Sequence, residues 1–246
     1  MLATVSTPRC LLGVSDLSPS EFEALLDLAA VMKRHPLAWR SALAGRAVAC
    51  VFEHSGLRSQ VSLEVAVHRL GALPVVLQPR GESTVDTAHA VSPFCDAIAV
   101  RTDRHRDLLD LVEHASVPVI NALTDREHPC RALADCLALR ERFGGLSGLD
   151  IAYVGGREPA MHSLIEAALL AGMTVRIASP AALLPDPALL ARAGSAVRVC
   201  ESADEATEGA DAVFTTGTPR PADAAADLLP VDQAVLRAIV TGEWEV

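Results

Sequence analysis

Short apolar segments alternate with amphipathic helical segments along most of this chain, and this alternation limits its possible folds more than any other feature. Strands with apolar cores that are separated by helices are typical of a parallel sheet covered on both faces. In the first half, the strands are predicted at 47–52, 73–77, 97–100 and 117–120, and the helices between them at 58–70, 84–90 and 107–114.

Two well-marked helices flank this first series. The segment Ser18–Glu21 is a capping box with proline at the first helical position, and apolar residues at helical spacing extend that helix to about Lys33. A longer helix is predicted over 128–143. Glycines at 144, 145 and 148 then interrupt the pattern, so we place a boundary there and predict domains at 1–145 and 146–246.

The second half repeats the alternation. Its strands are predicted at 151–154, 175–178, 197–200 and 212–214, with a helix at 160–170. The stretch 219–228 is rich in alanine, proline and aspartate and is predicted to be a loop or a disordered segment. The fold class is therefore α/β, with two domains built on parallel sheets.

Charge and hydropathy exclude several classes of function. The formal net charge is −10 and aromatic residues make up only 3% of the chain, which argues against nucleic-acid binding. No apolar run reaches the roughly 18 residues that span a bilayer, and no secretory signal precedes the first helix. We therefore expect a soluble, cytoplasmic protein with no membrane partner.

The cysteines do not suggest a metal centre or a disulfide framework. None of the six forms a Cys-x-x-Cys pair, so we expect no zinc site, no other metal and no cofactor. Cys50 lies in a predicted strand and Cys136 in a predicted helix, where reduced and buried thiols fit best. Cys130 could be a nucleophile, although no ordered base is indicated near it.

Three segments follow predicted strands, where open parallel sheets bind their ligands. The first, Phe52–Ser59, joins a strand to a helix start, and Arg58 there is suited to a phosphate. The second is Arg101 with Thr102 and His105. The third, His128–Arg131, is a helix start with His128 near the cap. The alternatives are an ordinary turn with a surface arginine, a solvated loop charge and a structural histidine, respectively.

These segments and three others resemble motifs of the ornithine/aspartate carbamoyltransferase family. Phe52–Glu64 resembles FEKxSTRTRVSFE, and Asp96–Thr102 resembles DAIVIRT. The other matches, in the same order along the chain, are Gly81–Ala88 with GES and DTA, Pro118–Asn121 with PVIN, His128–Asp135 with HPCQALAD, and Ile151–Leu164 with LAYVGDGNNVAHSL. The HPC form of the histidine motif, with RT before it, points to the ornithine branch.

The resemblance implies a fold, an activity and a set of site residues. Family members have two parallel three-layer αβα domains, a cleft between them and usually a trimeric assembly. They transfer a carbamoyl group from carbamoyl phosphate to an amine without a metal or a cofactor. The first domain binds carbamoyl phosphate and the second the acceptor. The implied catalytic residues are Ser59, Arg101 and His128, and the implied substrate-binding residues are Ser55, Gly56, Leu57, Arg58, Ser59, Gln78, Arg101, His128 and Arg131.

Several family positions are changed in this chain. Gly56 and Leu57 replace two hydroxyl residues, and Arg131 replaces a glutamine. Gly155–Pro159 replaces GDGNN, and Thr215–Pro219 does not match DxWxSMG. We also expect the HCLP motif and the last helices to be missing, which would leave the second domain truncated.

Two functions are compatible with these changes. The chain is either a carbamoyltransferase, with an unusual amine as one candidate acceptor, or a catalytically inactive homologue that binds an anion or pairs with a partner subunit. Two positions also stay open for the Arg131 side chain, which either faces the ligand or pairs with an acid such as Glu127 or Asp135.

Overall fold

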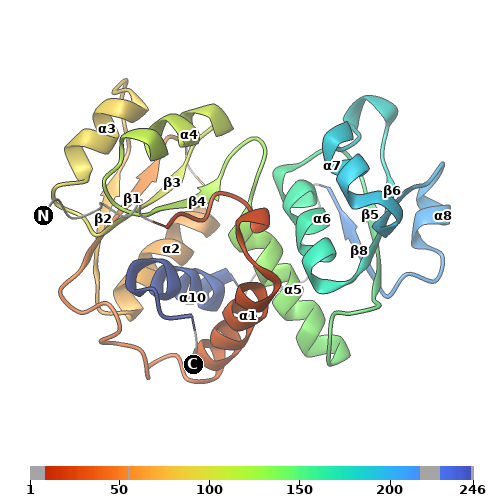
Figure 1. The fold of residues 1–246 in the computed structure, drawn as a ribbon, viewed down its shortest axis with the longest axis horizontal. Helices are drawn as coiled ribbons and strands as arrows, with labels where there is room; N and C mark the ends of the chain where they lie inside the picture. Colours follow the sequence, from red (N-terminus) through yellow and green to blue (C-terminus); the bar gives the residue numbers. More distant parts are fainter. Residues whose placement is uncertain (1–8, 55, 217–227, 245–246) are drawn as a thin grey trace, which may run out of the picture.

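The computed structural model describes residues 9–54, 56–216 and 228–244, and these form two lobes that are each built on a four-stranded parallel sheet (Figure 1). The first sheet has the order β2-β1-β3-β4 and the second the order β7-β6-β5-β8. The strands of the first sheet are β1 (Ala47–Phe52), β2 (Leu73–Leu77), β3 (Ala97–Arg101) and β4 (Val119–Leu123). Those of the second are β5 (Asp150–Val154), β6 (Thr174–Ala178), β7 (Val197–Val199) and β8 (Ala212–Thr215).

Helices cover both faces of the first sheet. Side chains of α3 and α4 pack on one face with Val51 and Ile98, while α1, α2 and α5 share the other core with Cys50 and Phe52. The alternate residues of β1 thus enter opposite cores, as in a fully covered strand. The helices are α1 (Pro19–Arg34), α2 (Leu57–Arg69), α3 (Thr84–Val91), α4 (His105–His114) and α5 (Pro129–Phe143), preceded by the 3-10 turn η1 (Val14–Asp16).

The second lobe is smaller but has the same three layers. Tyr153 and Ile177 face a core shared with α6 and α7, and Ala152 and Ala178 face the core under α8. The elements here are α6 (Pro159–Ala171), α7 (Pro187–Ala193) and α8 (Ala203–Thr207), with 3-10 turns η2 (Ala181–Leu183) and η3 (Gly194–Ala196). The expected α/β fold with two parallel sheets is confirmed.

The last described helix, α10 (Leu228–Thr241), returns to the first lobe and packs against α1, α2 and α5 (Figure 1). Nearly all of its residues between Leu228 and Ile239 are buried. No helix was predicted from the sequence in this part of the chain. A loop or disordered segment was predicted over 219–228, of which 219–227 lie outside the described residues and Leu228 already belongs to α10.

Most predicted elements occur within one or two residues of their expected bounds, and the capping box of Ser18 and Glu21 is present. One strand is displaced: β4 begins at Val119, whereas the prediction began it at residue 117. Pro118 has no N–H to donate to a ladder, and pairing with β3 starts only at Ile98 and Val119. No helix in the described part of the chain is long and apolar enough to cross a membrane.

Candidate functional site

The carboxyl ends of the four strands of the first sheet lie at one edge, because all four strands are parallel. The connection from β1 to α2, the turn after β3 and the turn from β4 to α5 therefore meet at this edge. These are the three segments in which the sequence predicted site residues. Such an edge is where open α/β sheets bind their ligands.

A pocket of about 650 Å³ opens at this edge, and several of the predicted residues line it. Arg58 and Ser59 reach it from the first turn of α2, and His128 and Arg131 reach it from the start of α5. The first N–H groups of α2 have no partner within the helix, so they are available to an anion. The rest of the lining is small or apolar and consists of Leu57, Val61, Ser62, Val65, Leu228 and Leu229.

Arg101 lies beside this pocket and is not part of its lining. Its guanidinium occupies the space next to Gly56, where a Cβ would come within 2.0 Å of Arg101 Nη1. Gly56 has a φ of −145°, so its backbone conformation suits any residue, and it is the end of the Arg101 side chain that fills the space of a Cβ. The family's hydroxyl side chain at this position is thus replaced by the arginine's own guanidinium.

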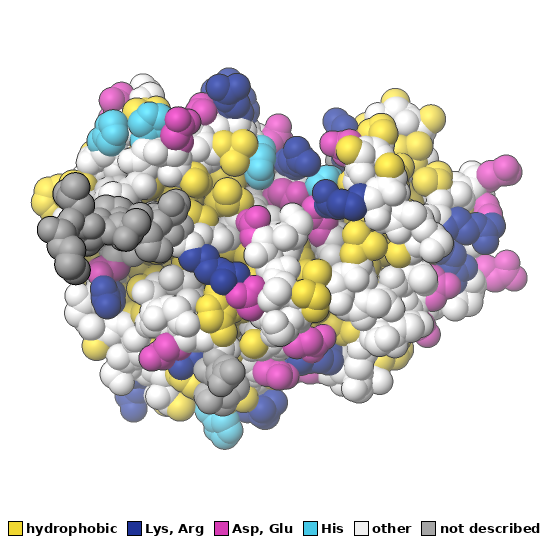
Figure 2. Space-filling view, in the orientation of Figure 1, with side chains coloured by type: hydrophobic (Ala, Val, Ile, Leu, Met, Phe, Trp, Pro, Cys, Tyr) yellow, Lys and Arg dark blue, Asp and Glu magenta, His cyan; other side chains and the backbone are white. Residues whose placement is uncertain are grey.

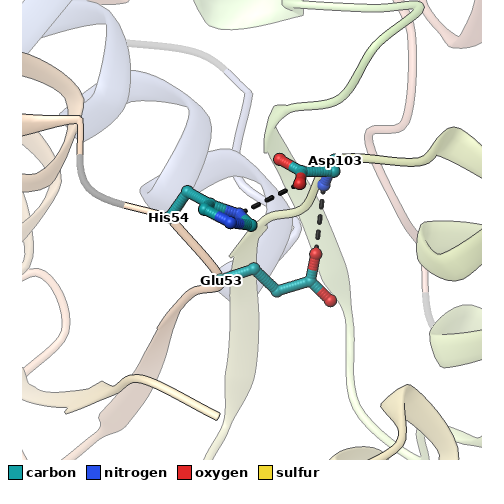
Figure 3. Close-up of side chains that lie close together, drawn as sticks. All are labelled: Glu53, His54 and Asp103. Carbon is teal, nitrogen blue, oxygen red and sulfur yellow. Dashed lines mark hydrogen bonds and ion pairs between the residues drawn. The ribbon is translucent and has the colours of Figure 1, made fainter. Parts of the chain in front are cut away.

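The two loops that carry these residues are tied together by an acidic side chain (Figure 3). Glu53 accepts a hydrogen bond from the Thr102 hydroxyl at 2.7 Å and another from the Asp103 N–H at 3.1 Å. His54 Nδ1 lies 3.0 Å from an Asp103 carboxylate oxygen. Thr102 is therefore a structural residue of the loop, and His105 points to Thr124 with its Nδ1 3.0 Å from that hydroxyl.

Of the predicted residues, Gln78 is not brought into the pocket, and Ser55 cannot be placed. Gln78 is exposed just beyond the carboxyl end of β2, at the outer side of the sheet. Ser55 lies outside the described residues. Their assignment to substrate binding stays a prediction.

Arg131 forms an ion pair within α5. Its Nε lies 3.1 Å from Oδ1 of Asp135, whose side chain has no exposed surface. Burial lowers the pKa of Arg131. Of the two positions considered for this side chain, the structure has the ion pair with Asp135, and the guanidinium still contributes to the wall of the pocket.

His128 occupies the N-cap position of α5, and its backbone is held from the second lobe. Its N–H donates to Ser163 Oγ on α6 at 2.9 Å. The Ser163 hydroxyl in turn donates to Glu127, whose other carboxylate oxygen lies 2.7 Å from His162 Nδ1. Sequence analysis assigned no role to Ser163 or His162, although both belong to the stretch that resembles AHSL.

The buried carboxyl group of Asp232, on α10, contacts a residue of the pocket lining. Asp232 accepts a hydrogen bond from Ser62 Oγ at 2.6 Å, and burial raises its pKa to about 7. It also contacts Cys130, whose pKa is raised well above its usual value by complete burial. A buried thiol that stays protonated is a poor nucleophile, so this environment argues against a catalytic role for Cys130.

A second pocket, of about 210 Å³, lies between the two lobes. It is lined from the first lobe by Asp125 and Arg126, and from the second by Arg157, Glu158, His162 and Asp186. Figure 2 shows charged side chains of both signs on the two sides of the notch between the lobes. The turn that follows β4 thus contributes to both pockets, through Asp125 and Arg126 on one side and His128 on the other.

Among the residues that the structure describes, two groups of side chains have the composition of a metal site. One is Glu53, His54 and Asp103, and the other is the buried set Glu127, His162 and Glu166. In both groups the carboxylates already accept hydrogen bonds, Glu53 from Thr102 and Asp103, Glu127 from Ser163, and Glu166 from the Ser15 N–H and from Arg192. These contacts match structural roles in holding loops and lobes together.

Family models match nearly the whole described chain. The model described as "Aspartate/ornithine carbamoyltransferase, carbamoyl-P binding domain" matches residues 9–141. The model described as "Aspartate/ornithine carbamoyltransferase, Asp/Orn binding domain" matches residues 147–222. The first match contains Arg58, Ser59, His128 and Arg131 of the pocket lining, and the second contains α6 with Ser163.

Individual relatives agree with these matches. The chain is 44% identical over 220 residues to an ornithine carbamoyltransferase of Acidothermus cellulolyticus, which covers 84% of this chain and 70% of that protein. The corresponding enzyme of Thermus thermophilus is 42% identical over 217 residues, covering 86% and 71%. A crystal structure of ornithine carbamoyltransferase from Thermus thermophilus superposes with a TM-score of 0.88 at 35% identity, covering 96% of this chain and 100% of that one.

Proposed function

Because this chain belongs to the aspartate/ornithine carbamoyltransferase family, we propose that it transfers the carbamoyl group of carbamoyl phosphate to an amino group of an amino acid or a related amine. The observation that carries this proposal is the pocket at the edge of the first sheet. Arg58 and Ser59 from one motif and His128 from another, far apart in the sequence, line the same cavity of about 650 Å³.

Each side chain has a part in this chemistry. Arg58 and the free N–H groups of α2 hold the phosphate of the donor. The amine attacks the carbamoyl carbon, a C–N bond forms, and the bond from that carbon to the phosphate oxygen breaks while the amine loses a proton. Ser59 and His128 stabilise the negative charge that develops on the carbonyl oxygen, and Arg101 joins them by turning away from Gly56. Positioning and electrostatics suffice, as in other transfers that need no covalent intermediate.

Ornithine is the first acceptor to test, since the relatives are named for it. The changes at Gly155–Pro159 remove the asparagine of the family motif, so a different amine is the second possibility. We also propose that the protein acts as a homotrimer in the cytoplasm. The competing function is an inactive homologue that binds an anion or a partner subunit.

A panel of amines distinguishes these functions. Each acceptor is incubated with carbamoyl phosphate, and carbamoylated products are detected by mass spectrometry. Enzyme-free reactions are essential controls, because carbamoyl phosphate decomposes and its products carbamoylate amines slowly. We expect one acceptor to give product well above this background. Binding of carbamoyl phosphate in a calorimeter without product from any amine would favour the inactive homologue.

A further inference from the structure

We propose that Ser163 of the second lobe and Glu127 of the turn before α5 are positioning residues that fix His128. The proposal rests on the proposed function, in which His128 polarises the carbonyl oxygen. It adds two residues from different lobes to the machinery around that histidine. Neither contacts the pocket of about 650 Å³, so both act through His128.

The direction of the hydrogen bonds defines the connection. The Ser163 hydroxyl has one hydrogen, and it donates this to the Glu127 carboxylate. Its oxygen therefore accepts from the His128 N–H, at 2.9 Å. Ser163 is completely buried and Glu127 is 4% exposed, so water does not compete for these bonds. Such bonds are expensive to leave unmade in a buried site.

Glu127 is itself held rigidly. Its backbone N–H donates to the Thr124 hydroxyl at 3.1 Å, and its carbonyl oxygen accepts from the Thr124 N–H at 2.9 Å. These two bonds close the turn between β4 and α5. The carboxylate is therefore presented to α6 from a fixed turn, and His128 is the next residue along the chain.

The second lobe contributes two successive residues of α6. The Nδ1 of His162 lies 2.7 Å from Oε1 of Glu127, and the two side chains are 6% and 5% exposed. Ser163 contacts the other oxygen of the same carboxylate. The carboxylate of Glu127, the residue before His128, thus contacts α6 through both of its oxygens. A shift of α6 would therefore move the His128 backbone at the start of α5.

The consequence concerns catalysis more than donor binding. Arg58 and the N-terminus of α2 hold the phosphate without help from α6, whereas the imidazole of His128 is useful only when it is aimed at the carbonyl oxygen. Small displacements of a catalytic group are costly, and a misplacement of about 1 Å can lower a rate by about a hundredfold. Loss of this connection should therefore lower kcat and leave the KM for carbamoyl phosphate nearly unchanged.

The test compares Ser163→Ala, Glu127→Gln and the control Glu166→Gln. The amide of the glutamine can still accept from Ser163, so Glu127→Gln should be the milder of the first two. Glu166 on α6 accepts from the Ser15 N–H of the first lobe and pairs with Arg192 within its own lobe, so its variant alters a contact between the lobes without removing the bond to His128. Two readouts are taken for each folded variant, namely steady-state kinetics and hydrogen exchange of the His128 amide.

We expect Ser163→Ala to lower kcat by about tenfold to a hundredfold and to change the KM for carbamoyl phosphate by less than about threefold. Its His128 amide should exchange faster than in the wild type, while Glu166→Gln keeps both properties. Unchanged exchange in Ser163→Ala, or equal effects of Glu166→Gln, would overturn the proposal. If the wild type has no transferase activity, the proposed function fails, and the exchange measurement still decides whether Ser163 and Glu127 fix His128.

Discussion

At the scale of single residues, Arg131 shows how burial changes the meaning of a charge. From the sequence alone, Arg131 would be a third arginine, beside Arg58 and Arg101, in a site that attracts anions. In the structure it lies 3.1 Å from the buried Asp135, one helical turn further along α5. Much of its positive charge is therefore compensated within the helix, and the pocket is less cationic than its residue types suggest.

Replacement of Arg131 by glutamine, the family residue, should affect stability more than ligand binding. The change leaves Asp135 buried without its cation, and breaking a buried pair in this way costs roughly 3 kcal/mol or more. Urea denaturation measures this loss, and calorimetry measures phosphate affinity. The double variant Arg131→Gln/Asp135→Asn should regain much of the stability. Normal stability of the single variant together with a loss of phosphate binding would place Arg131 on the ligand instead.

Asp232 should make the stability of the protein depend on pH. Burial raises its pKa to about 7, whereas an aspartate in an unfolded chain titrates at roughly 4. The folded protein thus binds this proton more tightly than the unfolded chain does. The protonated carboxyl group therefore adds to the free energy of unfolding in full below about pH 4, and this contribution is lost as the pH rises through about 7. Asp232→Asn should remove this dependence and be more stable than the wild type at about pH 8.

The measurement for Asp232 is the difference in unfolding free energy between variant and wild type across this pH range. Asp204→Asn is the matched control, because Asp204 is exposed and its replacement removes a carboxylate that is not buried. A difference for Asp232→Asn that is the same at every pH would show that this carboxyl group does not titrate as described.

The residues that share the pocket could be predicted from the sequence only where one segment carried the information. Arg58, Ser59 and His128 line one pocket, as expected for motifs at the ends of parallel strands, and their roles in binding and catalysis stay predictions. Asp232 and Ser163 were missed because each acts through a partner that is distant in sequence. Asp232 contacts Ser62, and Ser163 contacts His128. Local patterns contain no information on such pairs.

At the scale of elements, the turn from β1 to α2 departs from the family pattern at two neighbouring positions. Gly56 leaves space that the Arg101 guanidinium fills, and Leu57 is 77% exposed on the wall of the pocket. Two hydroxyl groups that could donate to a phosphate are thereby absent. Neither change disturbs the helix, which begins at Leu57 with its first N–H groups directed to the site.

Restoring the hydroxyl groups with Gly56→Ser/Leu57→Thr should strengthen binding of carbamoyl phosphate. The end of the Arg101 side chain is flexible enough to move, and a hydrogen bond to a charged group is worth about 1.5 kcal/mol, or about a tenfold lower Kd. The control Gly56→Ala/Leu57→Val has nearly the same shape without the hydroxyl groups. Equal Kd values for these two variants would mean that the added hydroxyl groups do not reach the ligand.

The strands and the longer helices followed from periodicity, whereas three helices did not. The segments of α7 and α8 are only 7 and 5 residues long, so a helical period is hardly visible in them. The helix α10 contains Pro230 close to its start and is buried nearly all round, which hides the amphipathic pattern of a surface helix. Its place against α1, α2 and α5 is a tertiary property that no local pattern in the sequence specifies.

At the scale of the whole molecule, α10 connects the end of the described chain to the first lobe. The sequence placed residues 146–246 in a single second domain, and the boundary near residue 145 falls between α5 and β5. We propose that α10 be counted with the first lobe, because its neighbours are α1, α2 and α5. Leu228 and Leu229 at its start then line the pocket of about 650 Å³ together with residues of α2 and α5.

The protein should form a homotrimer. Several large apolar side chains of the first lobe are exposed, among them Val61 at 58%, Leu73 at 63% and Phe94 at 80%, and such surfaces are often covered by partners. Val61 also lines the open pocket, so a neighbouring copy could close it. Light scattering at micromolar concentration should give the mass of three chains. A single monomeric species at that concentration would contradict the prediction.

Product formation is the direct test of the proposal that the pocket of Arg58, Ser59 and His128 performs carbamoyl transfer. Carbamoyl phosphate labelled with ¹³C is mixed with ornithine, and the labelled product is quantified by mass spectrometry for the wild type, Arg58→Ala and His128→Ala. We expect wild-type product above the enzyme-free control, with each variant slower by about a hundredfold or more. Equal rates for the wild type and both variants, or no wild-type product with ornithine or any other amine, would contradict it.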